Sequence, residues 1–239
     1  GVHKQIASAL DGRAKLIVQT STIRTEDGIE NAKHAAGVGA DAILVLPPYF
    51  EGPGEDGVRW HYEQIAKATK TPIMVYNIPV YSGFDITPAV YARLSQIENI
   101  KYIKDSTANM LRIEQLIAQG AAVFNGCDYL NFYSLIAGGP GVFTGSGNAI
   151  GAELVKLYDL VQSGKLSEAA TLWKRLRPLS MLFWEEPFNP VAKAASKLSG
   201  RDVGVCRWPV PPLNSDQMAK VVAAYAAVGG KDARRAGAA

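Results

Sequence analysis

A lysine lies inside a short apolar segment of the chain, residues 100–106, which reads IKYIKDS. The β-branched and aromatic neighbours of Lys104 predict a strand that is buried on both faces. Burial disfavours the charged ammonium group and lowers the pKa of a lysine, and a neutral amine is a nucleophile toward a carbonyl carbon. Lys104 is therefore a candidate for Schiff-base formation. The alternative is a structural ion pair with Asp105 or another carboxylate, and the strand alone leaves both interpretations open.

A tyrosine stands near the end of another apolar segment, PIMVYNI, at residues 72–78. A phenol beside an imine can carry a proton between the lysine, the carbinolamine and the substrate. The alternative for Tyr76 is packing in the core, with its hydroxyl bonded to the backbone. Because Tyr76 and Lys104 both stand at expected strand ends, a shared catalytic role is favoured over two separate packing roles.

Short apolar segments alternate with longer segments of helical period, which predicts an α/β fold with a parallel sheet covered by helices. The expected strands are residues 15–21, 42–48, 72–78, 101–106, 121–126 and 141–146. The expected helices between them are residues 26–39, 56–69, 87–96 and 109–120. Thr87 and Pro88 predict the start of the third helix, and Gly120 predicts the end of the fourth.

The strand pattern stops near residue 147, and four helical segments follow at residues 151–164, 166–184, 190–200 and 216–228. We therefore expect residues 1–150 to form the portion that carries the active site and residues 151–228 to form a helical C-terminal extension. Residues 229–239 are rich in glycine, alanine and charge, and we expect a disordered tail there.

The expected sheet fits a doubly wound fold or part of a (β/α)₈ barrel, and both folds place their chemistry at the carboxyl ends of the strands. Most of the residues expected at those ends are polar: Thr20, Ser21, Tyr49, Tyr76, Asn77, Lys104, Asp105, Asp128 and residues 144–146. A set of this kind is suited to binding a small polar molecule.

Composition narrows the classes of partner. The 239 residues carry a net charge of only +3, and the basic residues are scattered, so we expect no nucleic-acid partner. No apolar run reaches the roughly 18 to 20 residues that a membrane span needs, so we expect no membrane partner. Cys127 and Cys206 are too few for a disulfide framework, which favours a reducing, cytoplasmic compartment.

The sequence does not contain the residue patterns of metal sites, dinucleotide-binding loops or serine hydrolases. His3, His34 and His61 stand far apart, so we expect no metal site. The GSGNAIG stretch at residues 145–151 has the wrong glycine spacing for a dinucleotide loop, and no G-x-S-x-G elbow surrounds Ser146. We therefore expect no cofactor.

Four stretches of the chain resemble the superfamily of dihydrodipicolinate synthase and N-acetylneuraminate lyase: VYNIPVYSG at 75–83, YIKDSTAN at 102–109, NGCDYLNF at 125–132 and GGPGVFTGSGN at 138–148. The resemblance extends from about residue 5 to residue 228. It implies a (β/α)₈ barrel with a helical C-terminal extension, usually a tetramer, that acts on pyruvate or another 2-oxo acid through a lysine Schiff base. A homo-oligomer, either a dimer or a tetramer, is implied in the same way.

The same resemblance implies roles for particular residues. Lys104 matches the Schiff-base lysine and Tyr76 the proton-relay tyrosine. The GVFTGSGN stretch matches a loop that lines the pocket, and Asp128 matches a position that faces substrate hydroxyls in sugar-acid members. With the residues expected at strand ends, the implied substrate-binding set is Tyr49, Tyr81, Ser106, Asp128, Phe143, Gly145 and Ser146.

The chain departs from the superfamily pattern near the substrate. Tyr81 replaces the arginine that binds the second substrate in the synthase branch, and Phe50 replaces a second tyrosine of that branch. Tyr129 replaces a glutamate of the sialic-acid lyases. These departures favour a sugar-derived or aromatic 2-oxo acid. The alternatives are 4-hydroxy-tetrahydrodipicolinate synthesis and a barrel that binds a 2-oxo acid without turnover.

The loop that grips the pyruvate carboxylate in the superfamily, of the type Gly-Thr-Thr-Gly-Glu, has no counterpart in the chain, and six strands cannot close an eight-stranded barrel. We therefore expect two further βα units, about 60 residues, upstream of Gly1.

Overall fold

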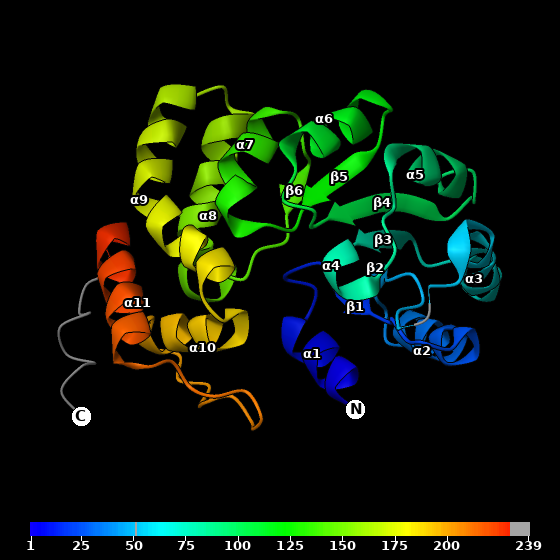
Figure 1. Ribbon diagram of the computed structural model, residues 1–239, viewed down its shortest axis with the longest axis horizontal. Helices are drawn as coiled ribbons and strands as arrows, with labels where there is room; N and C mark the ends of the chain where they lie inside the picture. Colours follow the sequence, from blue (N-terminus) through cyan, green and yellow to red (C-terminus); the bar gives the residue numbers. More distant parts are fainter. Residues whose placement is uncertain (51, 230–239) are drawn as a thin grey trace. The chain divides into compact units, whose positions relative to one another are not determined.

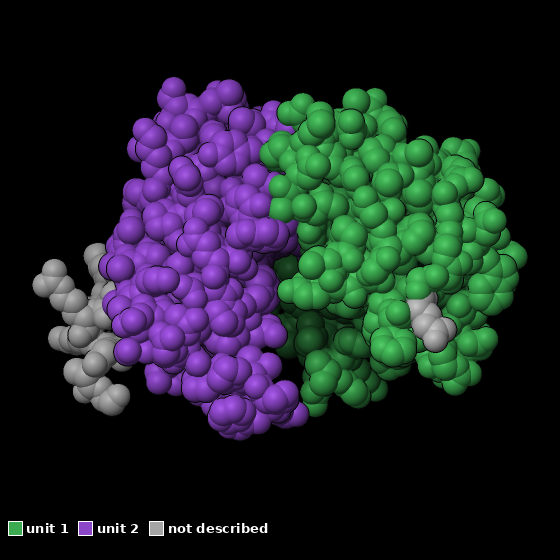
Figure 2. Space-filling model, viewed as in Figure 1, with its two compact units in different colours: residues 1–124 green, residues 125–239 purple. Residues whose placement is uncertain are grey.

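The computed structural model describes residues 1–50 and 52–229 of the chain. By packing, the chain divides into two compact units, Gly1–Phe124 and Asn125–Ala239 (Figure 2). This division falls earlier than residue 150, where the helical extension is expected to start. That boundary remains a prediction, as does the tail at residues 229–239, of which residues 230–239 lie outside the described part of the chain.

Within the described residues, six strands follow one another in chain order in one sheet (Figure 1). They are β1 (Ile17–Gln19), β2 (Ala42–Val45), β3 (Ile73–Asn77), β4 (Ile100–Asp105), β5 (Ala122–Asn125) and β6 (Gly141–Val142). The first four strands pair in parallel. Each strand lies in or within one residue of a segment expected to be one, and all four residues of β2 are buried. The α/β fold class and the six strands are thus confirmed, whereas two further βα units remain a prediction.

One helix precedes the strands of the first unit and the others separate them. They are α1 (Val2–Leu10), α2 (Thr25–Gly37), α3 (Gly54–Ala68), α4 (Pro79–Ser82), α5 (Pro88–Leu94) and α6 (Met110–Ala118). Apolar side chains of α3 are buried, and the hydroxyl of Tyr62 donates to the carbonyl of Val45 in β2 at 2.7 Å. The Thr87 side chain caps α5 as predicted, and Gly120 follows α6 with a φ of 82°. Neither α1 nor α4 has a clear sequence signal, because α1 buries no residue and α4 is a single turn.

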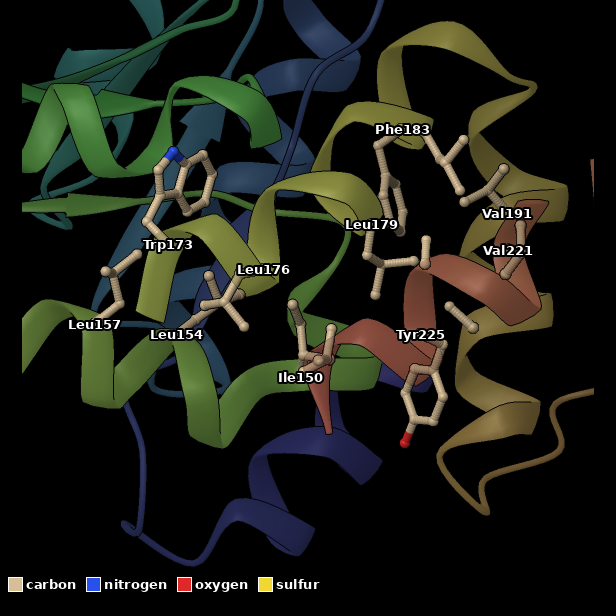
Figure 3. Packing of buried hydrophobic residues seen from close by; sticks show 14 of the residues in the cluster. Ile150, Leu154, Leu157, Trp173, Leu176, Leu179, Phe183, Val191, Val221 and Tyr225 are labelled. Carbon is tan, nitrogen blue, oxygen red and sulfur yellow. The ribbon is translucent and has the colours of Figure 1, made fainter. Parts of the chain in front are cut away.

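The second unit is mainly helical. After the turn η1 (Asp128–Leu130) come α7 (Asn131–Ile136), β6, α8 (Gly147–Gln162), α9 (Leu166–Glu185), α10 (Phe188–Leu198) and α11 (Ser215–Val228). The C-terminal helices share a core in which Leu157, Leu176, Leu179, Val191 and Val221 are fully buried (Figure 3). Asn214 and Gln217 form a reciprocal capping box at the start of α11. The predicted C-terminal helices are therefore confirmed.

Candidate active site

Tyr76 and Lys104 are register partners on the neighbouring strands β3 and β4. Residues paired in this way on parallel strands project to the same face of a sheet. The Lys104 Nζ atom lies 3.9 Å from the centroid of the Tyr76 ring. Each residue is the second to last of its strand. The structure thus brings together the two residues predicted to carry the chemistry.

Lys104 is partly exposed, which corrects the expectation of a strand buried on both faces. Burial alternates along β4: Ile103 and Asp105 are buried, whereas Tyr102 and Lys104 are partly exposed. The physical reason is the two-residue period of a strand, because only one face of β4 is fully covered. A partly open amine can be reached by a ketone, which a sealed amine could not.

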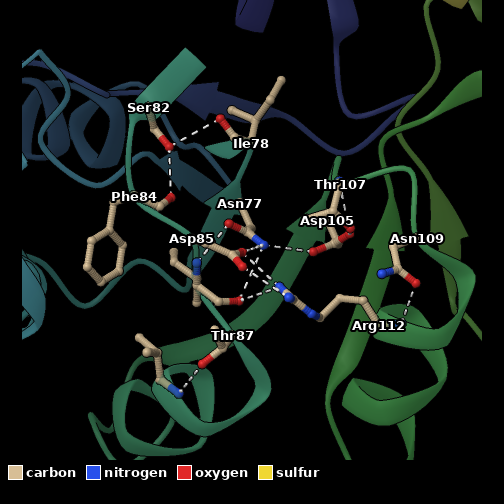
Figure 4. A network of polar contacts seen from close by, with 12 residues as sticks. Asn77, Ile78, Ser82, Phe84, Asp85, Thr87, Asp105, Thr107, Asn109 and Arg112 are labelled. Carbon is tan, nitrogen blue, oxygen red and sulfur yellow. Dashed lines mark hydrogen bonds and ion pairs between the residues drawn. The ribbon is translucent and has the colours of Figure 1, made fainter. Parts of the chain in front are cut away.

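Asp105 belongs to the opposite face of β4 from Lys104, because successive residues of a strand alternate in direction. Its carboxylate accepts hydrogen bonds from the Asn77 side chain at 2.9 Å, and from the Thr107 main-chain N–H at 3.1 Å and hydroxyl at 2.5 Å (Figure 4). Burial raises the pKa of the Asp105 carboxyl, and these hydrogen bonds oppose that shift. The described contacts of Asp105 therefore favour a structural network over an ion pair with Lys104.

Ser106 follows β4 and is 8% exposed. Its main-chain N–H donates to the carbonyl of Asn77 at 2.8 Å. Its hydroxyl is buried and has no hydrogen-bond partner among the described residues. A buried hydroxyl without a partner is costly, so this group is suited to a ligand.

Tyr49 and Tyr81 lie in the segments that follow β2 and β3. Tyr49 is partly buried, and Tyr81, in α4, is 78% exposed. Phe50, between β2 and α3, is exposed and has a φ of 84°, a conformation that side chains other than glycine rarely adopt. The structure places these side chains near the carboxyl ends of their strands, and their contact with substrate remains a prediction.

Four further residues of the predicted set lie in the second unit, where Asp128 is the centre of a cluster. Its buried carboxylate accepts hydrogen bonds from the Thr144 hydroxyl, from the Gly145 N–H at 3.0 Å and from the Ser146 N–H at 2.7 Å. The Phe143 N–H donates to the carbonyl of Asn125 in β5 at 2.7 Å. Asp128 therefore shapes the loop that follows β6, and its contact with substrate hydroxyls remains a prediction.

Two charged residues of the first unit lie outside the predicted set but are linked to Asn77, the neighbour of Tyr76 on β3. Asp85 accepts from the Asn77 side chain at 3.3 Å, and both of its carboxylate oxygens pair with Arg112 at 2.8 and 3.0 Å. The Arg112 guanidinium lowers the pKa of the Asp85 carboxyl. The sequence does not predict this ion pair, because Arg112 lies on α6, 27 residues beyond Asp85, and no local motif links the two residues.

Metal and membrane features are absent from the described residues. Within residues 1–50 and 52–229, no group of three or more histidine, cysteine or acidic side chains is placed to hold a metal ion. None of the helices described there is both long and apolar enough to cross a membrane.

Parallel α/β sheets carry their chemistry at the carboxyl ends of the strands, and a lysine there, as Lys104 is beside Tyr76, suits an enzyme that uses a lysine amine on carbonyl substrates. Comparison with known proteins is more specific: the chain belongs to the dihydrodipicolinate synthetase family, which it matches over residues 2–228. Members of this family are class I lyases.

Relatives of the chain are named 4-hydroxy-tetrahydrodipicolinate synthase or dihydrodipicolinate synthase. The chain is 33% identical over 215 residues to 4-hydroxy-tetrahydrodipicolinate synthase 1 of Halalkalibacterium halodurans. The match covers 89% of this chain and 73% of that protein. The chloride-inhibited dihydrodipicolinate synthase of Acinetobacter baumannii, solved with pyruvate, is 27% identical with a TM-score of 0.90 and covers 96% of this chain and 80% of that one. A monomeric dihydrodipicolinate synthase variant is 28% identical with a TM-score of 0.89, covering 96% and 79%. These names support the alternative activity of the sequence analysis better than its main expectation of a sugar-acid substrate.

Proposed function

We propose that the chain is a pyruvate-dependent lyase in which Lys104 forms a Schiff base with the substrate ketone. The observation that carries this proposal is the placement of the partly exposed Lys104 amine against Tyr76 on the neighbouring strand. The neutral amine attacks the ketone carbon to give a carbinolamine, and loss of water gives the iminium. The iminium then withdraws electrons, so that a proton or a carbon fragment can leave the adjacent carbon.

Tyr76 acts as the proton relay in this scheme. Its phenol donates a proton to the departing hydroxyl of the carbinolamine and takes it back when the imine is hydrolysed. The Lys104 Nζ atom lies over the Tyr76 ring, so the two groups are adjacent before substrate binds. General acid–base help of this kind is worth about 10²- to 10⁴-fold in rate.

The favoured reaction is the condensation for which the relatives are named, 4-hydroxy-tetrahydrodipicolinate synthesis. In that reaction the enamine formed from pyruvate on Lys104 attacks the aldehyde of an α-amino acid, and the product closes to a ring. Tyr81 stands where the synthase branch is expected to have an arginine. A phenol offers the second carboxylate a hydrogen bond but no charge. We therefore expect weaker binding of the amino aldehyde than an arginine would give.

A second candidate is cleavage of a sugar-derived 2-oxo acid. Tyr81 and Tyr129 favour it, because both replace charged residues of the named activities with phenols. The Tyr129 ring packs against Trp184 at 5.5 Å between centroids. The relatives' names weigh against this candidate, so it ranks second, followed by a barrel that binds pyruvate without turnover.

The substrate-binding set remains part of the proposal: Tyr49, Tyr81, Ser106, Asp128, Phe143, Gly145 and Ser146. Within this set, Ser106 has the most direct support, because its buried hydroxyl has no hydrogen-bond partner among the described residues. A homo-oligomer and a cytoplasmic location are also proposed. The monomeric relative shows that a solved structure of this kind need not be an oligomer.

Turnover assays with two sets of substrates test the reaction type. Pyruvate is offered with amino-acid aldehydes in one set, and sugar-derived 2-oxo acids are offered alone in the other, with pyruvate consumption or release as the readout. We expect consumption of pyruvate with an amino aldehyde. Release of pyruvate from sugar acids alone would establish the second candidate, and binding of pyruvate without turnover in either set would establish the binding barrel.

A further inference from the structure

The placement of Tyr76 opposite Lys104 depends on a register shift between β3 and β4. Ile73 pairs with Ile100, but the next residue, Met74, pairs with Tyr102, so that β4 gains one residue at this point. A shift of one residue turns every later side chain of a strand to the other face of the sheet. The facing of Tyr76 and Lys104 therefore needs something beyond the ladder to hold the shifted register.

Asn77 joins the two strands directly after the Tyr76–Lys104 pair. Its side-chain amide donates to the Asp105 carboxylate at 2.9 Å, between residues that are themselves register partners. Both side chains are at most 1% exposed. A buried hydrogen bond to a charged group is among the stronger ones in proteins, and it orients both partners.

The Asn77 carboxamide also fixes the segment that follows α4. Its Oδ1 atom accepts from the Ile86 N–H at 3.0 Å, and its Nδ2 group lies 3.3 Å from both the Ile86 carbonyl and the Asp85 carboxylate. Asp85 is in turn held by the fork of Arg112 on α6 (Figure 4). Only a side chain that both donates and accepts can make these bonds at once, which explains an amide at this position.

We infer that Asn77 is a positioning residue, which fixes Tyr76 against Lys104 by bonding Asp105 across the shifted strands and Ile86 behind them. This inference rests on the proposed function, since it assigns Asn77 a part in the same chemistry. Asn77 faces away from the amine and touches no reacting atom.

The test compares the single variant Asn77→Asp with the exchanged double variant Asn77→Asp/Asp105→Asn. The single variant sets two buried carboxylates against each other. The double variant restores one donor and one acceptor between positions 77 and 105, but not the donor that faces Asp85 and the Ile86 carbonyl, so we expect a partial recovery. We expect kcat for the pyruvate reaction to fall on the order of 10²-fold in the single variant, because a misplacement of about 1 Å can cost that much in rate. The double variant should regain at least a tenth of the parent kcat, about tenfold above the single variant.

Thermal unfolding separates positioning from general stability. A structural role alone would lower the melting temperature of the single variant and leave kcat per folded molecule unchanged, and that result would overturn the inference. So would a folded double variant without recovery of kcat. If Asn77→Asp does not fold, Arg112→Lys replaces it, because lysine keeps the charge and loses the fork to Asp85. That variant should lose kcat in the same direction, and an unchanged kcat would again overturn the inference.

Failure of the proposed function is detected separately, by the absence of turnover and of a pyruvate adduct in the parent chain. The positioning role is then measured with pyridoxal phosphate and borohydride, which label amines without needing the natural substrate. The ratio of label on Lys104 to label on the exposed Lys101 should rise in Asn77→Asp and return toward the parent value in the double variant. An unchanged ratio would contradict the inference.

Discussion

The chemistry of the chain can be traced to two side chains. Lys104 and Tyr76 stood out in the sequence because each is a reactive polar group near the end of an apolar segment. The structure places them as register partners with the amine over the ring. The sequence could not predict the partial exposure of Lys104, because an apolar segment does not reveal which of its faces is covered.

Replacement of Tyr76 by phenylalanine tests the proton relay. Phenylalanine keeps the ring beside Lys104 and removes only the hydroxyl. We expect the pyruvate imine still to form and kcat to fall by about 10²-fold or more, because general acid–base help is lost. Steady-state kinetics and borohydride trapping on the same preparation measure both quantities. An unchanged kcat would make Tyr76 a packing residue.

His61 is expected to make stability depend on pH. The ring is 1% exposed, its Nδ1 atom lies 2.9 Å from the Thr25 hydroxyl, and burial lowers the pKa of His61 to about 4. In the unfolded chain the His61 imidazole has a pKa near 6.5 and binds the proton more tightly than in the folded chain, so protonation favours unfolding. The stabilising contribution is complete above the unfolded pKa and falls as the pH drops from about 6.5 toward 4. Its size is on the order of 3 kcal/mol.

Urea unfolding at pH 7 and at pH 4.5 measures this contribution. The variant His61→Gln should lose less stability between the two pH values than the parent, although it starts from a lower value because packing is lost. His34→Gln is the matched control, because His34 is exposed, and it should follow the parent. Equal losses in the parent and in His61→Gln would show that another group governs the acid limb.

At the scale of elements, the strands were the most predictable part of the fold. Apolar segments between helical segments locate all six of them, and Thr87 and Gly120 mark helix ends as expected. The register shift between β3 and β4 has no sequence signal, because it depends on pairing between strands. The last strand was expected to reach residue 146 and ends at Val142. The N–H groups of Gly145 and Ser146 donate to the Asp128 carboxylate instead and are therefore not available for strand pairing.

The loop after β6 requires glycine at position 145. A Cβ atom there would lie 2.6 Å from the rings of Phe183 and Phe188, in backbone that Asp128 holds. We expect Gly145→Ala to lower the free energy of unfolding by about 1 to 3 kcal/mol, the usual cost of overpacking. Gly151→Ala in α8 is the control, since a Cβ there meets nothing within 4 Å. It should leave stability unchanged or raise it by up to about 1 kcal/mol. Equal effects in urea unfolding would contradict this view of the loop.

For the whole molecule, the family was predictable and the substrate was not. Ordered motifs around Tyr76 and Lys104 led to the superfamily, and the family match over residues 2–228 agrees with it. The substrate could not be predicted, because the departures at Tyr81 and Tyr129 removed charges without indicating what replaces them. The relatives' names now favour synthesis over sugar-acid cleavage. Contact between Tyr81 and a second substrate remains a prediction.

A covalent adduct at Lys104 is the most direct test of the proposed function. The parent chain, Lys104→Arg and the control Lys101→Arg are incubated with pyruvate, reduced with borohydride, digested and mapped by mass spectrometry. Lys101 is exposed on the same strand, and arginine keeps the positive charge at both positions, so this control differs from Lys104→Arg only in which amine is removed. We predict a reduced pyruvate adduct on Lys104 in the parent and in Lys101→Arg, and no adduct in a folded Lys104→Arg. An adduct on another lysine in Lys104→Arg, or a folded parent that forms none, would contradict the account.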